Sequence, residues 1–286
     1  MTSNSSVVRI IELWRPLRPL LPVDCLMSVG SLPWASDSTV EEDAKQWRAS
    51  HVGERNDEKL ALVSLRAKPL GSVTFEFGKT TWAEVRPANL RRERDPTIGE
   101  VDSAVGVFAR THLWPAPNLC AVHVAVRTSD NALVLSRRAA DLAFYPGSWS
   151  ASFEEQLDPA DLLSGSAPHR AAARGLREEF GVEIGEARDE DFVILALIVE
   201  WPSGNVGWVM AGDLDLTFGE VAERRTNVPS SMAEWDDLRS ASSATGSVAE
   251  LQQSRLPLDG QPIGAVHPTV AIRLALASAY WAARSR

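Results

Sequence analysis

The first hundred residues contain two stretches in which hydrophobic and polar side chains follow the pattern of paired strands. Residues 59–68 and 72–82 have strand composition, and Val73, Phe75 and Phe77 alternate with polar neighbours in the second stretch. This period of two is typical of a half-buried strand, so residues 69–71 are predicted to form a hairpin loop.

The stretch that follows, residues 86–100, is polar and rich in turn-forming residues, which predicts a connector. We therefore expect an N-terminal α+β region over residues 1–110 and a second domain over residues 111–286, with the boundary near this connector.

The second region alternates predicted strands with predicted helices. Apolar strand patterns lie at residues 119–128, 132–138, 192–201 and 206–216. Helical patterns lie at residues 169–180, 231–241 and 268–286. Because several strands pair as hairpins and helices lie between them, the sequence predicts an α/β fold in which helices flank a mixed sheet.

Composition and charge narrow the classes of function. Hydrophobic residues make up 44% of the chain, enough for a substantial core, and the formal net charge is −9. Such an acidic chain is not expected to bind nucleic acid non-specifically, although a metal ion could still bring a small phosphorylated ligand to it. Cys25 and Cys120 lack metal-type spacing, so two reduced core thiols are favoured over a single disulfide.

The N-terminal segment and the apolar runs indicate where in the cell the protein is expected. The N-terminal segment lacks the basic start and apolar run of a signal peptide, and the longest apolar run, residues 192–199, is too short to span a bilayer. We expect a cytoplasmic protein with a small-molecule partner and no membrane or nucleic-acid partner. A homodimer is compatible with the sequence.

The predicted helix at residues 169–180 carries adjacent carboxylates in its last turn. Leu176 and Phe180 are four apart on an apolar face, Glu178 and Glu179 lie elsewhere on the helix, and Gly181 is the expected C-cap. Two glutamates at the negative end of a helix dipole each cost about 0.3–1 kcal/mol, and a divalent cation would reverse that sign. The alternative is a solvated helix end in which nearby arginines pair with the glutamates.

The segment AAARGLREEFGV, residues 171–182, resembles the second half of the Nudix box. That motif is a glycine, five residues, a glutamate, seven residues and then R-E-U-x-E-E-x-G-U, where U is a bulky aliphatic residue. The matching positions are Arg174, Leu176, Glu178, Glu179, Gly181 and Val182. The predicted strands at 119–128 and 132–138, and the segment YPGSWSASFEEQL at 145–157, fall where that fold has its first hairpin and the strand and loop before the box.

The resemblance covers residues 119–238 and implies a Nudix-type α/β/α sandwich with a mixed sheet. In that family the box helix carries Mg²⁺ ligands that bind a diphosphate linked to another moiety, and water attacks phosphorus. It therefore implies a hydrolase of a nucleoside diphosphate derivative that uses Mg²⁺ or Mn²⁺.

The chain departs from the box at the first glutamate of R-E-U-x-E-E, where Gly175 stands. In part of the family that residue is the general base or a metal ligand. Ser166 and Ala160 stand where the earlier glutamate and glycine of the motif would lie, so residues 158–168 are interpreted as an insertion or a rebuilt loop.

A replacement carboxylate could come from the loop predicted before the helix, at Glu154 or Glu155. We favour Glu155, because a glutamate followed by Gln or Gly occurs here in box variants that have RGL in place of REL. The alternative is that both glutamates are surface loop residues. The resemblance also implies a further acidic residue after the last strand, for which Glu234 or Asp236 is the candidate base.

Aromatic and histidine side chains near the predicted site have two interpretations each. Trp149, Trp201 and Trp208 lie on predicted strands. One of them could stack on a base of the ligand, and Trp149 is the candidate. The alternative is that all three pack in the core. His123 is expected to be a satisfied core histidine, and His169 is expected to be exposed in the first turn of its helix.

The N-terminal region contains a phosphate-binding look-alike. Gly78-Lys79-Thr80 lacks the glycine five residues earlier that a P-loop requires, so that function is excluded. The region bears a faint resemblance to UDP-glucose pyrophosphatase-like Nudix members, carried by Gly78, Thr80 or Thr81, Trp82 and Asn89. The alternative is a strand-to-helix turn in which Thr80 is the N-cap.

These observations define the predicted site. The resemblance implies that Glu178, Glu179 and Glu155 hold the metal, with Glu155, Arg174 and Glu178 catalytic and with Trp149 and Glu234 binding substrate. Two other functions stay open: a nucleotide-binding sensor that does not cleave its ligand, and a structural Nudix fold without a ligand.

Overall fold

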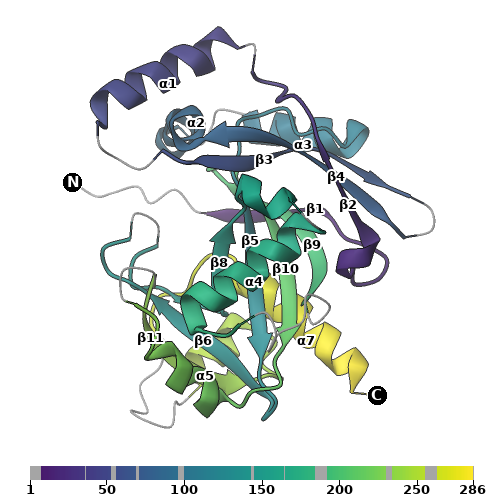
Figure 1. The fold of residues 1–286 in the computed structure, drawn as a ribbon, viewed down its shortest axis with the longest axis vertical. Helices are drawn as coiled ribbons and strands as arrows, with labels where there is room; N and C mark the ends of the chain where they lie inside the picture. Colours follow the sequence, from purple (N-terminus) through teal and green to yellow (C-terminus); the bar gives the residue numbers. More distant parts are fainter. Residues whose placement is uncertain are drawn as a thin grey trace.

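The larger of two sheets contains eight strands in the described part of the chain (Figure 1). The structure, a computed structural model, describes residues 8–35, 37–52, 56–68, 71–95, 100–142, 145–163, 165–183, 192–229, 234–254 and 263–285. The strand order is β1-β9-β10-β5-β6-β11, with β7 beside β6 and β8 beside β5. The bounds are β1 Arg9–Trp14, β5 Cys120–Arg127, β6 Ala132–Arg138, β7 Trp149–Ser150, β8 Phe153–Gln156, β9 Phe192–Trp201, β10 Val206–Asp213 and β11 Trp235–Ser242.

This sheet is mixed, as the sequence predicted. Strands β9 and β10 form the predicted antiparallel hairpin, whereas β10 runs parallel to β5. Strand β1 pairs with β9, with Arg9 opposite Trp201, so residues 9–14 add a strand to the sheet of the second region. The division into two domains near residue 110 stays a prediction.

The smaller sheet has the order β2-β4-β3, with β2 Cys25–Val29, β4 Val73–Thr81 and β3 Glu58–Ala67. Strands β3 and β4 are antiparallel, which confirms the predicted pairing, and β2 runs parallel to β4. The ring of Trp208 on β10 lies 5.5 Å from the ring of Phe75 and 5.6 Å from that of Phe77, centroid to centroid. All three are fully buried, so one core joins the two sheets.

Helices cover both faces of the large sheet. The helix bounds are α1 Ser38–Ser50, α2 Trp82–Arg94, α3 Glu100–Thr111, α4 Ala167–Phe180, α5 Phe218–Arg225, α6 Val248–Gln253 and α7 Val270–Arg284, with short 3-10 turns η1 Pro22–Asp24 and η2 Pro159–Leu162. Leu176 and Phe180 of α4 pack into the core that contains Val122 and Val124 of β5. Leu274 of α7 packs into a second core around Ala125, the next residue of the same strand. Because neighbouring strand residues face opposite sides, α4 and α7 lie on opposite faces, and the layers are α/β/α (Figure 1).

Two predicted elements were wrong. Most of residues 86–100 is helix α2 rather than a connector, because Thr81 and Glu84 form its N-terminal capping pair: the Thr81 amide donates to Glu84 Oε2 at 2.8 Å. The N-cap is thus Thr81, not Thr80. The predicted helix at 231–241 is strand β11 in its described part, because pairing with β6 overrides its helical composition.

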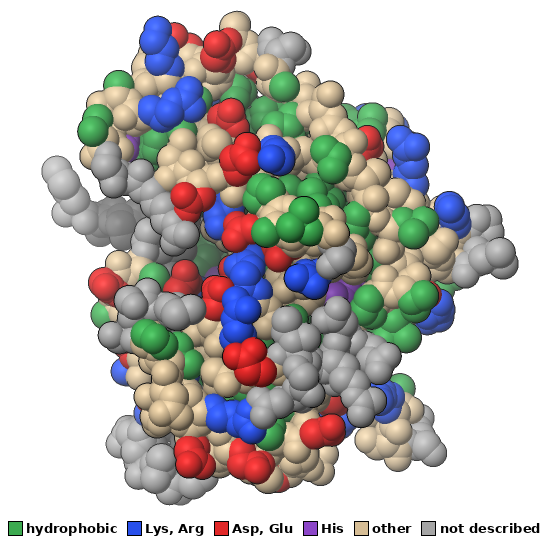
Figure 2. Space-filling model, viewed as in Figure 1, with side chains coloured by type: hydrophobic (Ala, Val, Ile, Leu, Met, Phe, Trp, Pro, Cys, Tyr) green, Lys and Arg blue, Asp and Glu red, His purple; other side chains and the backbone are tan. Residues whose placement is uncertain are grey.

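The two cysteines are unpaired, as the sequence favoured. No helix in the described ranges is long and apolar enough to cross a membrane. Cys25 and Cys120 are buried free thiols. On the face shown in Figure 2, acidic and basic side chains are intermixed over the surface.

Candidate functional site

A cavity of about 770 Å³ lies between the two sheets, at the point where α4, β8 and the β9–β10 turn meet α2 and β3. This volume is typical of a small-molecule site. Its polar lining comprises Asp57, Lys59, Trp82, Arg86, Glu93, His123, Arg138, Tyr145, Glu154, Glu155, Gln156, Asp158, Arg174, Glu178, Glu179, Glu200, Ser203, Asn205, Glu234 and His267. Five of the residues predicted from the sequence are therefore brought together here: Glu155, Arg174, Glu178, Glu179 and Glu234.

The cavity is strongly acidic. Among the described residues that line it, nine are acidic and four are basic, which gives a formal charge of −5 when every carboxylate is ionised. Each basic side chain is already paired across a short distance: Lys59 with Asp158 at 2.6 Å, Arg86 with Glu93 at 2.7 Å, Arg138 with Glu154 at 2.8 Å and Arg174 with Glu155 at 2.6 Å. An anionic ligand would therefore be repelled unless a cation accompanied it.

Helix α4 places its two glutamates differently. Gly181 adopts the left-handed conformation, with φ of 67°, and ends the helix as predicted. The Glu178 side chain is 27% exposed, whereas Glu179 is buried and accepts a hydrogen bond from the Glu234 amide at 3.1 Å. Burial, reinforced by the nearby Glu234 carboxylate, raises the pKa of Glu179 to about 9. Glu179 is therefore mostly protonated at neutral pH in the absence of a cation.

Glu155 lies on strand β8, which corrects the prediction that it belongs to a loop. A Cβ at Gly175 would lie 2.6 Å from Phe153 Cε2 and 3.1 Å from Glu155 Cβ, so β8 occupies the space that a side chain at position 175 would need. Burial raises the pKa of Glu155 to about 7, although Arg174 opposes the shift. Glu155 of β8 thus lies beside Gly175, and its role as a replacement for the box glutamate stays a prediction.

Arg174 holds the rebuilt loop against the helix. Its guanidinium donates to Glu155 Oε1 at 2.6 Å, to the Gln156 carbonyl at 2.7 Å and to Asp161 Oδ2 at 2.9 Å. The departure from the box at residues 158–168 therefore supplies Asp161 as a buried partner for this arginine. Arg174 is 4.0 Å from Glu178, so it is a partner of the loop more than of its own helix.

The carboxylates fit a divalent cation in donor type and not in spacing. Glu155, Glu178, Glu179 and Glu234 offer hard oxygen donors, and the repulsion that raises their neighbours' pKa values would be relieved by positive charge. Within the described ranges, however, no three acidic, histidine or cysteine side chains are close enough to hold one ion. Glu155 faces Arg174 instead.

A second polar cluster was not predicted from the sequence. Glu154 and Glu155 are neighbours on β8, so they point to opposite faces, and Glu154 faces helix α7. Its carboxylate accepts hydrogen bonds from Arg138 at 2.8 Å, from Ser150 at 2.5 Å and from the fully buried Arg273. Although burial alone would raise the pKa of Glu154, Arg273 and the other cations hold it well below its usual range.

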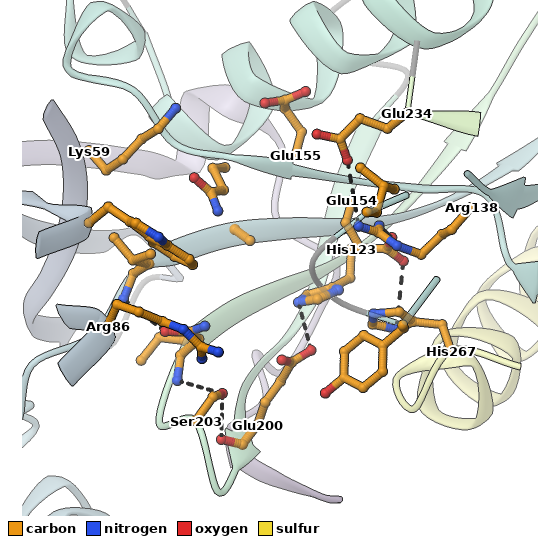
Figure 3. A pocket seen from close by; sticks show the side chains of 18 of the residues that line it. Lys59, Arg86, His123, Arg138, Glu154, Glu155, Glu200, Ser203, Glu234 and His267 are labelled. Atoms are coloured by element: carbon orange, nitrogen blue, oxygen red, sulfur yellow. Dashed lines mark hydrogen bonds and ion pairs between the residues drawn. The ribbon is translucent and has the colours of Figure 1, made fainter. Parts of the chain in front are cut away.

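His123, His267 and Glu200 complete this cluster (Figure 3). His267 Nδ1 lies 2.9 Å from Thr269 Oγ1, and His123 Nε2 lies 3.8 Å from Glu200 Oε1. Burial lowers the pKa of His267 to about 3 and that of His123 well below its usual value, so both rings are neutral. His123 is buried, as expected, but it also lines the cavity.

A signal for this cluster was present in the sequence. Glu200 ends an apolar strand and Arg273 interrupts an apolar helix, and a charged residue in such a run is buried only with a partner. The partners lie far away in the sequence, so the pairing itself could not be deduced.

Other predicted residues lie elsewhere. Trp149 is buried against Arg239, whose guanidinium carbon is 4.7 Å from its ring centroid, and the structure does not bring it to the cavity. Trp208 packs between the sheets as described above. His169 was expected to be exposed and is fully buried, with Nδ1 2.7 Å from Ser166 Oγ. Asp236 is exposed and does not line the cavity.

Comparison with known proteins gives structural likeness and no sequence match. No protein-family profile matches the chain, and a search of curated proteins finds no match either. A MutT protein from Methanosarcina mazei is similar over 59% of this chain and 97% of its own, at 12% identity and a TM-score of 0.35. The Nudix hydrolase RenU from M. smegmatis is similar over 59% of this chain and 83% of its own, at 17% identity and a TM-score of 0.33.

A third structure, DR0079 from Deinococcus radiodurans, is similar over 44% of this chain and 67% of its own, at 18% identity and a TM-score of 0.30. All three TM-scores are below 0.5, so these likenesses assign the chain neither a fold family nor a function. The strand pairing itself defines a mixed α/β fold, with a small three-stranded sheet beside the large mixed sheet.

Proposed function

We propose that the protein is a Nudix-type hydrolase that cleaves the diphosphate linkage of a nucleoside diphosphate derivative with the help of Mg²⁺ or Mn²⁺. The observation that carries the proposal is the group of carboxylates on one cavity wall, Glu155, Glu178, Glu179 and Glu234, which come from β8, from α4 and from the residue before β11. The resemblance of residues 171–182 to the Nudix box supports a role in binding cations for Glu178 and Glu179.

The residues of this wall would divide the work. Glu178, Glu179 and Glu155 would hold the cation only with their side chains closer together than in this structure. The cation would supply charge neutralisation of the diphosphate and a lower pKa for the attacking water. Arg174 would position Glu155 and steady its charge, and the half-exposed Glu234 would contact substrate. The acidity of the cavity supports a cation requirement, because a diphosphate alone would meet a net negative lining. The predicted contact of Trp149 with substrate stays a prediction without support from its position.

A sensor that binds a nucleotide without cleaving it is the second candidate. The bond between Arg174 and Glu155, and the absence of any three-ligand metal site among the described residues, favour it. In that case the same carboxylates would repel a free diphosphate and would admit one only with its own cation.

The test is a hydrolysis panel. ADP-ribose, UDP-glucose and dinucleotides are incubated with the full chain and Mg²⁺ or Mn²⁺, and products are separated by chromatography. If the protein is a hydrolase, at least one compound should give product only when the metal is present, and Glu179→Gln should lose this turnover. The matched control is Glu42→Gln, an exposed glutamate on α1, which should keep wild-type turnover.

The outcomes separate the candidates. Thermal stabilisation by a compound with Mg²⁺ but no product favours the sensor. Neither product nor thermal shift with any metal and nucleotide contradicts both. Turnover that survives in Glu179→Gln overturns the assignment of the metal ligands.

A further inference from the structure

Glu200 is a buried carboxylate that the proposed metal site does not use. It lies near the end of β9, and the residue is 8% exposed. Among the described residues its carboxylate accepts no hydrogen bond, and His123 Nε2 lies 3.8 Å from Glu200 Oε1, beyond hydrogen-bond length. Glu154, by contrast, has three donors. Glu200 therefore presents unsatisfied acceptor oxygens to the cavity that it lines (Figure 3).

His123 is placed beneath Glu200 by a glycine on the neighbouring strand. A Cβ at Gly207 would lie 2.4 Å from His123 Cδ2 and 2.5 Å from Nε2, so the imidazole rests directly on the backbone of β10. The other ring nitrogen, Nδ1, lies 3.4 Å from Thr269 Oγ1. The ring therefore turns Nε2 toward Glu200, and the imidazole and the carboxylate form one polar part of the cavity wall.

The turn that follows Glu200 is held in place by the N-terminal region. Arg92 of α2 donates to the Ser203 carbonyl at 2.5 Å, and Asn89 donates to Asn205 Oδ1 at 3.3 Å. Arg92 and Asn89 are both buried. The backbone of Glu200 is fixed from the other side, since its amide donates to the Asn205 carbonyl at 3.0 Å. The backbone that carries the acceptor is thus held in place, as a binding group requires.

The position of Glu200 limits what it can bind. Figure 3 shows it with Ser203 on the side of the cavity opposite to Glu155 and Glu234. A phosphate group is disfavoured there, because it would add negative charge beside the Glu200 carboxyl group. Every cationic side chain on the described lining already has a carboxylate partner. A neutral hydrogen-bond donor would satisfy the oxygens without that repulsion.

We propose that Glu200, together with the adjacent His123, binds the hydroxyl groups of a sugar ring of the substrate, at the end of the cavity remote from the diphosphate. A hydroxyl both donates and accepts, so it can pair with the carboxylate and with the imidazole together. The inference rests on the proposed function for the placing of the diphosphate at the α4 glutamates.

The test uses ligands that cannot be hydrolysed, so it does not depend on turnover. Calorimetry with Mg²⁺ measures the binding of the α,β-methylene analogues of ADP-ribose and ADP and of methylenediphosphonate, which has no sugar. We expect Glu200→Leu to weaken at least one sugar-bearing ligand by about tenfold or more and to leave methylenediphosphonate unchanged. Glu200→Gln, which keeps an acceptor oxygen, should retain most of the affinity, and Glu42→Gln all of it.

Each contrary result overturns the inference. The inference is wrong if Glu200→Leu leaves the affinity of every ligand unchanged, or if it weakens methylenediphosphonate as much as the sugar-bearing ligands. It is also wrong if the wild-type protein binds none of the ligands. A loss that disappears when hypoxanthine replaces adenine assigns Glu200 to the amino group and not to a hydroxyl. Thermal melts of both Glu200 variants show whether the fold is kept. The hydrolysis panel tests the proposed function separately, because it uses the native compounds and the wild-type chain.

Discussion

Gly175 and Glu155 approach so closely that a Cβ on residue 175 would lie 3.1 Å from the Cβ of Glu155. The glycine in the box is therefore required by the packing of β8 on α4. Strand β8 carries both Phe153, whose ring contacts that of Phe180, and Glu155, which lines the cavity. A glutamate at position 175 and β8 in its present place exclude each other.

The first prediction follows from this exclusion. Gly175→Ala should destabilise the protein by about 1–3 kcal/mol, because the new methyl group would lie 2.6 Å from Phe153 Cε2 and overpacking outweighs the gain in helix propensity. Gly175→Glu should be worse. The measurement is urea unfolding. Gly106→Ala on α3 is the control: its Cβ would meet only Arg110 Nη1, at 3.5 Å, so stability should rise by up to about 1 kcal/mol.

Glu179 makes stability depend on pH. Its pKa is about 9 in the folded protein and about 4.3 in an unfolded chain, so the folded state binds the extra proton between these values. Stability is then fully present at low pH and is lost as pH rises toward 9. In a metal-free buffer the wild-type protein should lose about 2 kcal/mol between pH 7 and pH 9.

Glu179→Gln isolates this effect, because an amide cannot ionise. The variant should be more stable than the wild type at pH 9 and should lose less stability between pH 7 and pH 9, as measured by urea unfolding with a chelator present. Glu155, with a pKa of about 7, is already half ionised at pH 7. It adds less than about 0.5 kcal/mol to the loss in this window, and it does so in both proteins. Parallel pH profiles of the two proteins would mean that Glu179 is ionised well below pH 9.

Local pattern predicted much of the fold. The bounds predicted for β9, residues 192–201, are those of the strand, because all ten of its residues are buried and the apolar run is continuous. Strand β11 was missed because it is polar and at the sheet edge, where pairing with β6 decides the structure. Helix α2 was missed because many of its residues are polar, and its capping pair was not recognised.

For the candidate site, too, local sequence predicted some residues and could not predict others. Residues within the box, Arg174, Glu178 and Glu179, could be selected because the motif is local. Glu155 was selected through resemblance, although it was assigned to a loop. Glu200 and His123 could not be placed together, because their meeting depends on the order of strands β9, β10 and β5, which local sequence does not determine.

Arg174 offers a test of the rebuilt loop. Arg174→Ala should destabilise the protein by about 3 kcal/mol or more, since it leaves the buried Asp161 and Glu155 without their cation. Arg174→Lys should recover only part of the lost stability. A lysine ammonium group lacks the planar, forked set of donors with which the guanidinium reaches all three acceptors. Urea unfolding measures both. Arg177→Ala, at a position whose side chain is 43% exposed, should change stability by less than about 0.5 kcal/mol.

The last prediction concerns the cation itself. Glu179 has a pKa of about 9 and Glu155 one of about 7, so both must release protons before they can bind Mg²⁺. The increase in Tm on adding Mg²⁺ should therefore be larger at pH 8 than at pH 6, and the apparent affinity should rise by up to about tenfold per pH unit for each proton released. Differential scanning calorimetry at matched ionic strength, with NaCl in place of MgCl₂ as the control, measures the shift. In Glu179→Gln the dependence on pH should shrink to the part that Glu155 contributes. An increase in Tm of equal size at both pH values, or one that Glu179→Gln leaves intact, would place the cation away from these carboxylates.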